Sequence, residues 1–299
     1  MTVASAPLPP DPAEPRHQRP PAPVTDGDVV SWRNAVVAEV PGFRPLTLDL
    51  TRPARATGPS PLIIWVHGGA WLFGSNKHES PQLAPGRIAE RILDAGFALA
   101  RVTYRFSGEA RFPAQLHDVK AAVRWLRKYA AELGLDPSRF GVWGESAGGH
   151  LASLVALTGD DPDPVLAGRD GVRGVSDAVQ SAVVWYGPAN LATMRGSHND
   201  PDSPESQLIG GPVPDLPTEA AVASPVTYVT PDAPPVLLVH GIDDRVVPAS
   251  QSEELHDRLA ALSGPVSLRL VPGADHCFVG ADLDPLVSEA LRHFEATLS

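Results

Sequence analysis

The chain has 299 residues, of which 43% are hydrophobic and 20% charged, an ordinary globular balance that is far from that of a disordered protein. Its net charge of −11 argues against a nucleic-acid-binding protein, because an acidic surface repels phosphate backbones. The single cysteine, Cys277, cannot form a disulfide within the chain, so a disulfide-stabilised scaffold is excluded as well.

The N-terminal 24 residues differ in composition from the rest of the chain. They contain eight of the 33 prolines and lack the basic start and apolar segment of a signal peptide. We predict a disordered, proline-rich tail over residues 1–24 and one domain over residues 25–299; a proline-rich docking ligand is the alternative for the tail. No stretch approaches the roughly 18 apolar residues of a membrane span. We therefore expect no membrane partner and a cytoplasmic location.

After the tail, short apolar runs alternate with stretches of helical periodicity. Strands are predicted over residues 34–40, 46–50, 62–67, 97–104, 139–143, 182–186, 236–239 and 266–270. Helices are predicted over residues 114–133, 147–157, 251–262 and 284–298. This alternation is typical of a mostly parallel sheet with helices on both faces. Residues 188–224 are too long for an ordinary connection, and they predict a small insertion over the C-terminal edge of the sheet.

A Gly-x-Ser-x-Gly sequence, residues 144–148, lies directly between a predicted strand and a predicted helix. In that context Ser146 sits on a sharp turn that exposes its hydroxyl, and Gly144 and Gly148 let the strand and helix approach. Free N–H groups at the helix N-terminus can stabilise an anion beside the serine. The pattern predicts a nucleophilic serine; the alternative is a small-residue turn without chemistry.

A second glycine-rich turn, HGGAW at residues 67–71, follows the predicted strand 62–67. Acyl transfer needs hydrogen-bond donors aimed at the developing oxyanion, and such a turn presents backbone N–H groups without bulky side chains. We predict Gly69, Ala70 and Ala147, the residue after Ser146, as these donors.

A nucleophilic serine needs a base and an acid that orients the base. His276 follows the predicted strand 266–270, and two adjacent acids, Asp243 and Asp244, follow the strand 236–239. The chain order serine, aspartate, histidine is the order found in α/β hydrolases. We expect the three side chains to meet at one edge of the sheet.

Together, HGGAW, GESAGGHLA and HGIDDRVVP resemble α/β-hydrolase esterases related to hormone-sensitive lipase and to the bacterial feruloyl-esterase-type group. The resemblance extends over about residues 36–298. It implies an α/β-hydrolase fold with an eight-stranded, mostly parallel sheet, and hydrolysis of carboxylic esters without a metal or cofactor. The same resemblance places the acid on Asp244, so that the implied catalytic residues are Ser146, Asp244 and His276.

The resulting hypothesis is a serine carboxylesterase that hydrolyses short-chain or aryl esters through an acyl-enzyme. Trp71, Trp185 and Tyr186 lie next to strand ends and are predicted to line the substrate site, with core packing as the alternative. Cys277 is predicted to be a wall residue of the pocket. Alternative functions are an amidase, formamidase or exopeptidase of the same fold, an acyltransferase, and a non-catalytic ligand-binding module. The expected partner is a small ester, and the sequence leaves the oligomeric state open.

Overall fold

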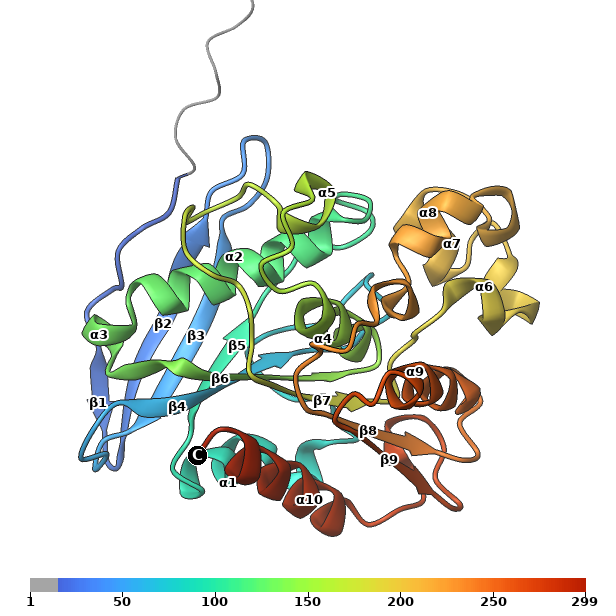
Figure 1. Ribbon diagram of the computed structural model, residues 1–299. Coiled ribbons are helices and arrows are strands. Elements are labelled where there is room, and N and C mark those ends of the chain that lie inside the picture. The colour runs from blue at the N-terminus through green and yellow to red at the C-terminus, as the bar shows by residue number, and fades with distance from the viewer. Residues whose placement is uncertain (1–15) are drawn as a thin grey trace, which may run out of the picture.

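A nine-stranded sheet forms the centre of the computed structural model, which describes residues 16–299 (Figure 1). The strand order is β1-β2-β3-β5-β4-β6-β7-β8-β9. The pairs β1-β2, β2-β3 and β3-β5 are antiparallel. All pairs from β5 onward in this order are parallel. The strands are β1 (Val24–Asp26), β2 (Val29–Ala38), β3 (Leu46–Pro53), β4 (Ser60–Val66), β5 (Ala98–Val102), β6 (Leu135–Glu145), β7 (Ser181–Trp185), β8 (Val236–Gly241) and β9 (Val266–Val271).

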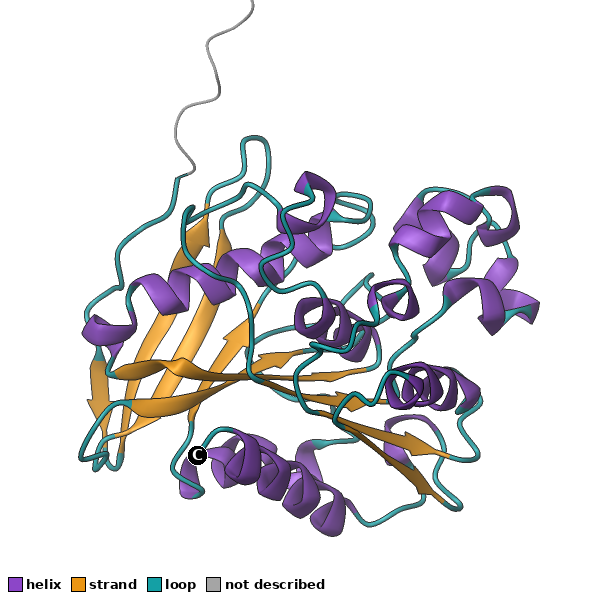
Figure 2. Cartoon of the chain, in the orientation of Figure 1, coloured by secondary structure: helices purple, strands orange, loops and turns teal. Residues whose placement is uncertain are grey.

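Helices cover both faces of this sheet (Figure 2). On one face α2, α4 and α9 pack on the strands, and on the other face α1 and α10 do so. None of the helices among residues 16–299 has the length and apolarity needed to cross a bilayer. The helices are α1 (Ile88–Asp94), α2 (Ala114–Lys128), α3 (Ala130–Leu133), α4 (Ala147–Leu157), α5 (Pro164–Ala167), α6 (Leu191–Met194), α7 (Pro204–Ile209), α8 (Pro217–Val222), α9 (Ser250–Ala261) and α10 (Leu283–Thr297).

Two separate hydrophobic cores result from this layering. Successive residues of a strand point to opposite faces, so Ile64 of β4 belongs to the core under α2 and α4, whereas Ile63 and Trp65 belong to the core over α10. Central strands that are buried on both faces explain the continuous apolar run of β4 in the sequence.

The predicted α/β-hydrolase fold is confirmed, but the strand number is nine rather than eight. The additional strand, β1, has three residues and pairs with the start of β2, so it is too short to give a periodic pattern. The predicted helix 114–133 is divided into α2 and α3 at Tyr129. Between β7 and β8, the predicted insertion contains the short helices α6, α7 and α8, which lie beyond the carboxyl end of β7 (Figure 1).

The predicted disordered tail is corrected for residues 16–24, whereas residues 1–15 lie outside the described part of the chain. Arg16 forms an isolated β-bridge with Glu39, and the Gln18 N–H donates to the Val36 carbonyl at 3.0 Å. The Gln18 carbonyl in turn accepts a hydrogen bond from the Trp125 indole at 2.8 Å. Because a buried indole N–H needs an acceptor, α2 fixes this segment against the domain.

Candidate active site

Ser146 occupies the sharp turn between β6 and α4, with φ 54° and ψ −122°. This left-handed conformation is costly for a residue other than glycine and needs support from its surroundings. The Ser146 N–H donates to the Trp185 carbonyl at 2.9 Å. A Cβ at Gly144 would lie 2.1 Å from the Gly148 carbonyl oxygen, and a Cβ at Gly148 would lie 2.0 Å from the Val66 carbonyl oxygen. The two glycines therefore permit the close approach on which the turn depends.

Ser146, His276 and Asp244 form a continuous line of hydrogen bonds. The Ser146 Oγ lies 3.0 Å from His276 Nε2, and His276 Nδ1 lies 2.8 Å from Asp244 Oδ2. The three residues follow β6, β9 and β8, whose carboxyl ends share one edge of the sheet. The structure thus brings together the three side chains that the sequence analysis selected, although they are 32 to 130 positions apart.

Asp244 is held by more contacts than a surface carboxylate would have. Its Oδ1 accepts hydrogen bonds from the N–H groups of Val246 and Val247, both at 2.8 Å, and His240 Nε2 lies 3.4 Å from its Oδ2. Burial by itself would raise the pKa of Asp244, but the hydrogen bonds from His240 and His276 outweigh it and hold that pKa well below its usual range. Asp244 is therefore ionised and can orient and stabilise a protonated imidazole. The neighbouring Asp243 is exposed.

The turn after β4 contains three consecutive residues with positive φ: Gly69, Ala70 and Trp71. A Cβ at Gly69 would lie 2.1 Å from the Phe73 carbonyl oxygen, so this position requires glycine. The Gly68 N–H donates to Glu145 at 2.8 Å, whereas the N–H groups of Gly69 and Ala70 have no acceptor within residues 16–299. Gly69 and Ala70 line the same cavity as Ser146, so they stay candidate oxyanion donors.

Ala147, the third predicted donor, is the first residue of α4 and follows Ser146 directly. Backbone N–H groups in the first turn of a helix have no acceptor within that helix and carry part of the positive end of its dipole. The position is compatible with donation to an oxyanion formed at Ser146.

Glu145, between the first glycine and the serine, was missed in the sequence analysis. Its buried carboxylate accepts the Gly68 N–H and lies 3.4 Å from the Tyr186 hydroxyl. Burial raises the pKa of Glu145. The residue connects the serine turn to the turn at residues 67–71, and its variable place in the Gly-x-Ser-x-Gly pattern gave no signal.

The predicted aromatic wall is wrong for two of its three members. Trp185 is fully buried, and its ring packs on those of Trp143 and Phe278 at centroid distances of 4.8 and 5.0 Å. Tyr186 is also fully buried, with its ring 4.8 Å from that of His276. Neither side chain has exposed surface that a ligand could contact. Trp185 is therefore a core residue, and Tyr186 packs against the His276 ring.

Trp71, the third member, is 1% exposed but borders a cavity that also contains Ser146. Its indole N–H donates to His150 Nδ1 at 3.2 Å, and His150 Nε2 donates to the Ala223 carbonyl at 2.6 Å. Burial lowers the pKa of His150 to about 4, so the ring is neutral and the two contacts fix its tautomer. His150 thus connects the turn at residues 67–71, helix α4 and the insertion.

Two cavities meet at Ser146. The first, of about 390 Å³, is called the apolar cavity; besides Ser146 and His276 it is lined by residues that include Phe73, Pro81, Val246 and Cys277. Phe73 is 64% exposed and Val246 51%, so the phenyl ring of Phe73 and the isopropyl group of Val246 are both accessible to a ligand. The second, of about 410 Å³, is called the polar cavity; it lies against the insertion and is lined by residues that include Ser197, His198, Asp200, Asp202, Glu205 and Arg245. Apart from Ser146, His276 and Cys277, the sequence analysis identified none of the residues named here as site residues.

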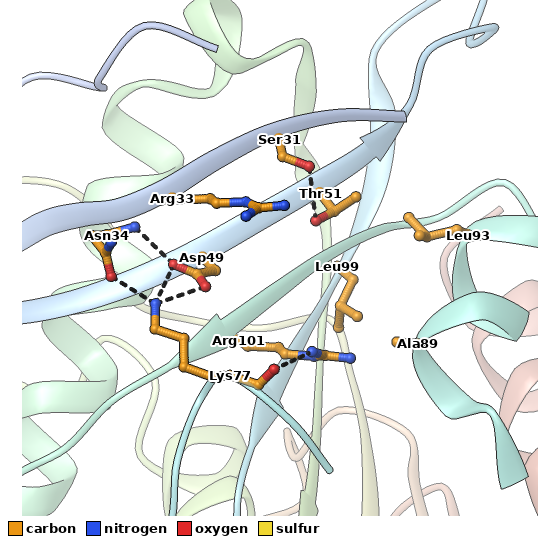
Figure 3. A pocket seen from close by; sticks show the side chains of 10 residues that line it. All are labelled: Ser31, Arg33, Asn34, Asp49, Thr51, Lys77, Ala89, Leu93, Leu99 and Arg101. Atoms are coloured by element: carbon orange, nitrogen blue, oxygen red, sulfur yellow. Dashed lines mark hydrogen bonds and ion pairs between the residues drawn. The ribbon is translucent and has the colours of Figure 1, made fainter. Parts of the chain in front are cut away.

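A further cavity of about 440 Å³ contains none of the candidate site residues (Figure 3). Several of its polar groups pair with one another: Lys77 Nζ lies 2.7 Å from both Asp49 carboxylate oxygens and from Asn34 Oδ1. Within residues 16–299, no group of three or more His, Cys, Asp or Glu side chains is placed to hold a metal ion.

Comparisons with known proteins agree with this arrangement. Residues 48–259 match the family model described as BD-FAE, a range that contains Ser146 and Asp244 but ends before His276. Esterase LipQ of Mycobacterium tuberculosis is 34% identical over 261 residues, which are 85% of this chain and 60% of LipQ. The chain spans 54–60% of the length of LipQ and two other curated relatives from the same organism.

Two solved structures are similar over most of both chains. A truncated form of a carbohydrate esterase from gut microbiota is 30% identical, with a TM-score of 0.79, and the match covers 89% of this chain and 95% of that one. An acetyl ester-xyloside bifunctional hydrolase from Caldicellulosiruptor lactoaceticus is 26% identical, with a TM-score of 0.70 and coverage of 86% and 92%.

Proposed function

The chain belongs to the BD-FAE family, and on this premise we propose that it is a serine carboxylesterase that hydrolyses short-chain or aryl esters. The observation that carries the proposal is the line from Ser146 Oγ through His276 to the ionised Asp244, next to the turn with Gly69 and Ala70. Relatives and solved structures described as esterases support ester hydrolysis.

The reaction proceeds in two steps. His276 Nε2 takes the Ser146 hydroxyl proton while Oγ attacks the ester carbonyl carbon, and Asp244 stabilises the imidazolium that forms. The N–H groups of Gly69, Ala70 and Ala147 donate to the oxyanion. The bond to the alcohol oxygen then breaks, His276 gives its proton to that oxygen, and the acyl group stays on Ser146. Water, deprotonated by His276, releases the acyl group as a carboxylic acid.

The apolar cavity supports a substrate with a short acyl or aryl group on one side of the scissile bond, since its lining carries Phe73, Pro81 and Val246 next to Ser146. The similar solved structures are described as a carbohydrate esterase and an acetyl ester-xyloside hydrolase, so carbohydrate and acetyl esters are candidate substrates as well. An amidase of the same fold uses the same residues, so the substrate test includes matched amides. The cytoplasmic location stays a prediction.

The proposal is tested with p-nitrophenyl esters of increasing acyl length, together with matched p-nitroanilides. We expect turnover of the esters and a loss of about a thousandfold or more in Ser146→Ala. Ser153→Ala is the matched control. Ser153 lies on α4, the helix that begins after Ser146, and its hydroxyl donates a hydrogen bond to the Gly149 carbonyl at 3.0 Å instead of reaching the site. A fluorophosphonate probe should label the wild type and Ser153→Ala but not Ser146→Ala. Near-full activity in Ser146→Ala contradicts the assignment.

A further inference from the structure

The two cavities at Ser146 differ in chemical character. Phe73 and Pro81 line the apolar cavity alone, and Val246 borders both cavities. The hydroxyl of Ser197, the imidazole of His198 and the carboxylates of the insertion line the polar cavity alone. An ester has two halves that extend from the scissile bond in different directions. A serine placed between cavities of unlike polarity therefore favours an ester with one apolar and one polar half.

Glu205 is the buried carboxylate of the polar cavity, with only 4% of its surface exposed. It lies on α7, and its Oε1 is 3.1 Å from His198 Nδ1. Its Oε2 is enclosed by protein atoms and has no hydrogen-bond partner within the described residues, so the Glu205 side chain has to turn toward the cavity before a ligand can reach this oxygen. A buried carboxylate oxygen without a partner is costly, and a donor supplied by a ligand removes that cost.

His198 is held by Glu205 through Nδ1, which leaves Nε2 on the opposite side of the ring. The side chain is 20% exposed and borders the cavity, so a ligand can reach it. The hydrogen bond that His198 donates to Glu205 raises the pKa of His198 above its ordinary value, so the carboxylate favours the imidazolium form that compensates its charge. When His198 is protonated, the pair offers hydrogen bonds without a net charge at the buried position.

The other charges of the cavity fit this description. Arg245 is paired with Asp275, and its side chain is 85% exposed. Asp200 and Asp202 are exposed, so water screens their charge. When a protonated His198 compensates Glu205, the buried part of the cavity selects for hydrogen-bond donors more strongly than for positive charge.

We propose that the polar cavity binds a hydroxyl-bearing half of the ester, and that Glu205, with His198 held beside it, accepts a hydrogen bond from that hydroxyl. This inference rests on the proposed esterase function and assigns a specificity-determining pair to it. The apolar half then lies against Phe73 and Val246. No covalent step at Glu205 or His198 is involved, so the reaction at Ser146 is unchanged.

The test uses pairs of esters that differ only in hydroxyl groups. For the alcohol half, 2,3-dihydroxypropyl butyrate is compared with propyl butyrate; for the acyl half, p-nitrophenyl 3-hydroxybutyrate is compared with p-nitrophenyl butyrate. We expect a higher kcat/KM for the hydroxylated member of one pair, and the pair concerned shows which half enters the polar cavity. Glu205→Ala should reduce this preference about tenfold, the range for a lost hydrogen bond to a charged group.

Glu219→Gln serves as the matched control for Glu205→Gln, because Glu219 is an exposed carboxylate of α8 in the same insertion. Glu219→Gln should keep the wild-type ratio. If Glu205→Ala does not fold, as judged by thermal unfolding, Glu205→Gln and His198→Gln carry the test, since both keep side-chain volume. Each should lower the preference for the hydroxylated ester.

Three results overturn the inference. The first is equal kcat/KM within both ester pairs for the wild type, and the second is a preference that persists in all Glu205 and His198 variants. The third is a preference for butyrylcholine, a cation without a donor, that disappears in Glu205→Gln, because it shows recognition of charge. A protein that hydrolyses no ester refutes the proposed function itself, and the inference falls with it.

Discussion

The edge of the sheet and the insertion each contribute a carboxylate–imidazole pair to the surroundings of Ser146. In the sheet edge, Asp244 contacts His276 at 2.8 Å, and His276 reaches Ser146 at 3.0 Å. In the insertion, Glu205 contacts His198 at 3.1 Å. The role of such a pair depends on what the second ring nitrogen of the imidazole, the one not bonded to the carboxylate, can reach. A nucleophile makes it a base, and an open cavity makes it a recognition element.

The supports of the two carboxylates also differ. Asp244 has two backbone N–H donors and two histidines around it, and both of its oxygens have a hydrogen-bond partner. Glu205 has one histidine and an oxygen without a partner in the described chain. A saturated carboxylate holds a base in one orientation, whereas an unsaturated one is available to a substrate.

The largest expected effect comes from removing the charge of Asp244. Asp244→Asn should lower kcat on p-nitrophenyl butyrate by about three to four powers of ten, because an amide stabilises neither the imidazolium nor the required tautomer of His276. Glu205→Gln makes the same chemical change in the insertion and should lower kcat far less. Equal losses in the two variants, measured by steady-state kinetics, would remove the distinction between the pairs.

The junction of the two regions should be sensitive to acid. His150 bonds Trp71 at the sheet edge and Ala223 in the insertion, and its pKa is lowered to about 4. Between pH 6.5 and 4 the unfolded chain binds a proton here that the folded protein does not, so the free energy of unfolding falls as the pH falls. At pH 5 the loss from this group is about 2 kcal/mol.

Urea unfolding at pH 7 and pH 5 checks this prediction. His150→Gln should lose about 2 kcal/mol less than the wild type between the two pH values. His256→Gln, at a partly exposed position on α9, should keep the wild-type difference. The same pH dependence in His150→Gln and the wild type would show that His150 does not titrate as its burial requires.

A smaller effect is expected from the Trp71 indole N–H, which fixes the turn at residues 67–71 with the proposed oxyanion donors. Trp71→Phe keeps an aromatic ring but loses the donor to His150, so the strained turn with Gly69 and Ala70 is held less firmly. We expect kcat to fall about tenfold with KM nearly unchanged, since the N–H groups act on the transition state.

Trp125→Phe is the matched control, because its indole also donates one hydrogen bond, to the Gln18 carbonyl, but away from Ser146. Both variants should lose about 1 kcal/mol of unfolding free energy. Only Trp71→Phe should lose kcat. A fall in kcat for both, in proportion to stability, would assign Trp71 a structural role alone.

The site residues at the sheet edge could be predicted from the sequence, whereas those of the insertion could not. Ser146 and its glycines form a local pattern, and His276 and the acids follow apolar runs that mark strand ends. His198 and Glu205 lie in a segment without periodicity, and only the path of the chain between α6 and α7 brings them together. The error on Trp185 has a similar cause, because proximity to a strand end does not specify which face of the sheet a ring covers.

The smallest effect is expected at Cys277, although it adjoins His276 at the sheet edge. The thiol lies in the wall of the apolar cavity, and burial raises its pKa to about 12. At pH 7 the thiolate then makes up roughly one part in 10⁵, and a protonated thiol is a poor nucleophile. Cys277→Ser should change kcat/KM less than about threefold, since it alters one atom of a wall that makes a small contribution to binding. A loss comparable to that of Ser146→Ala would instead show that the thiol takes part in the reaction despite its raised pKa. Its place beside His276 would then matter more than its protonation state.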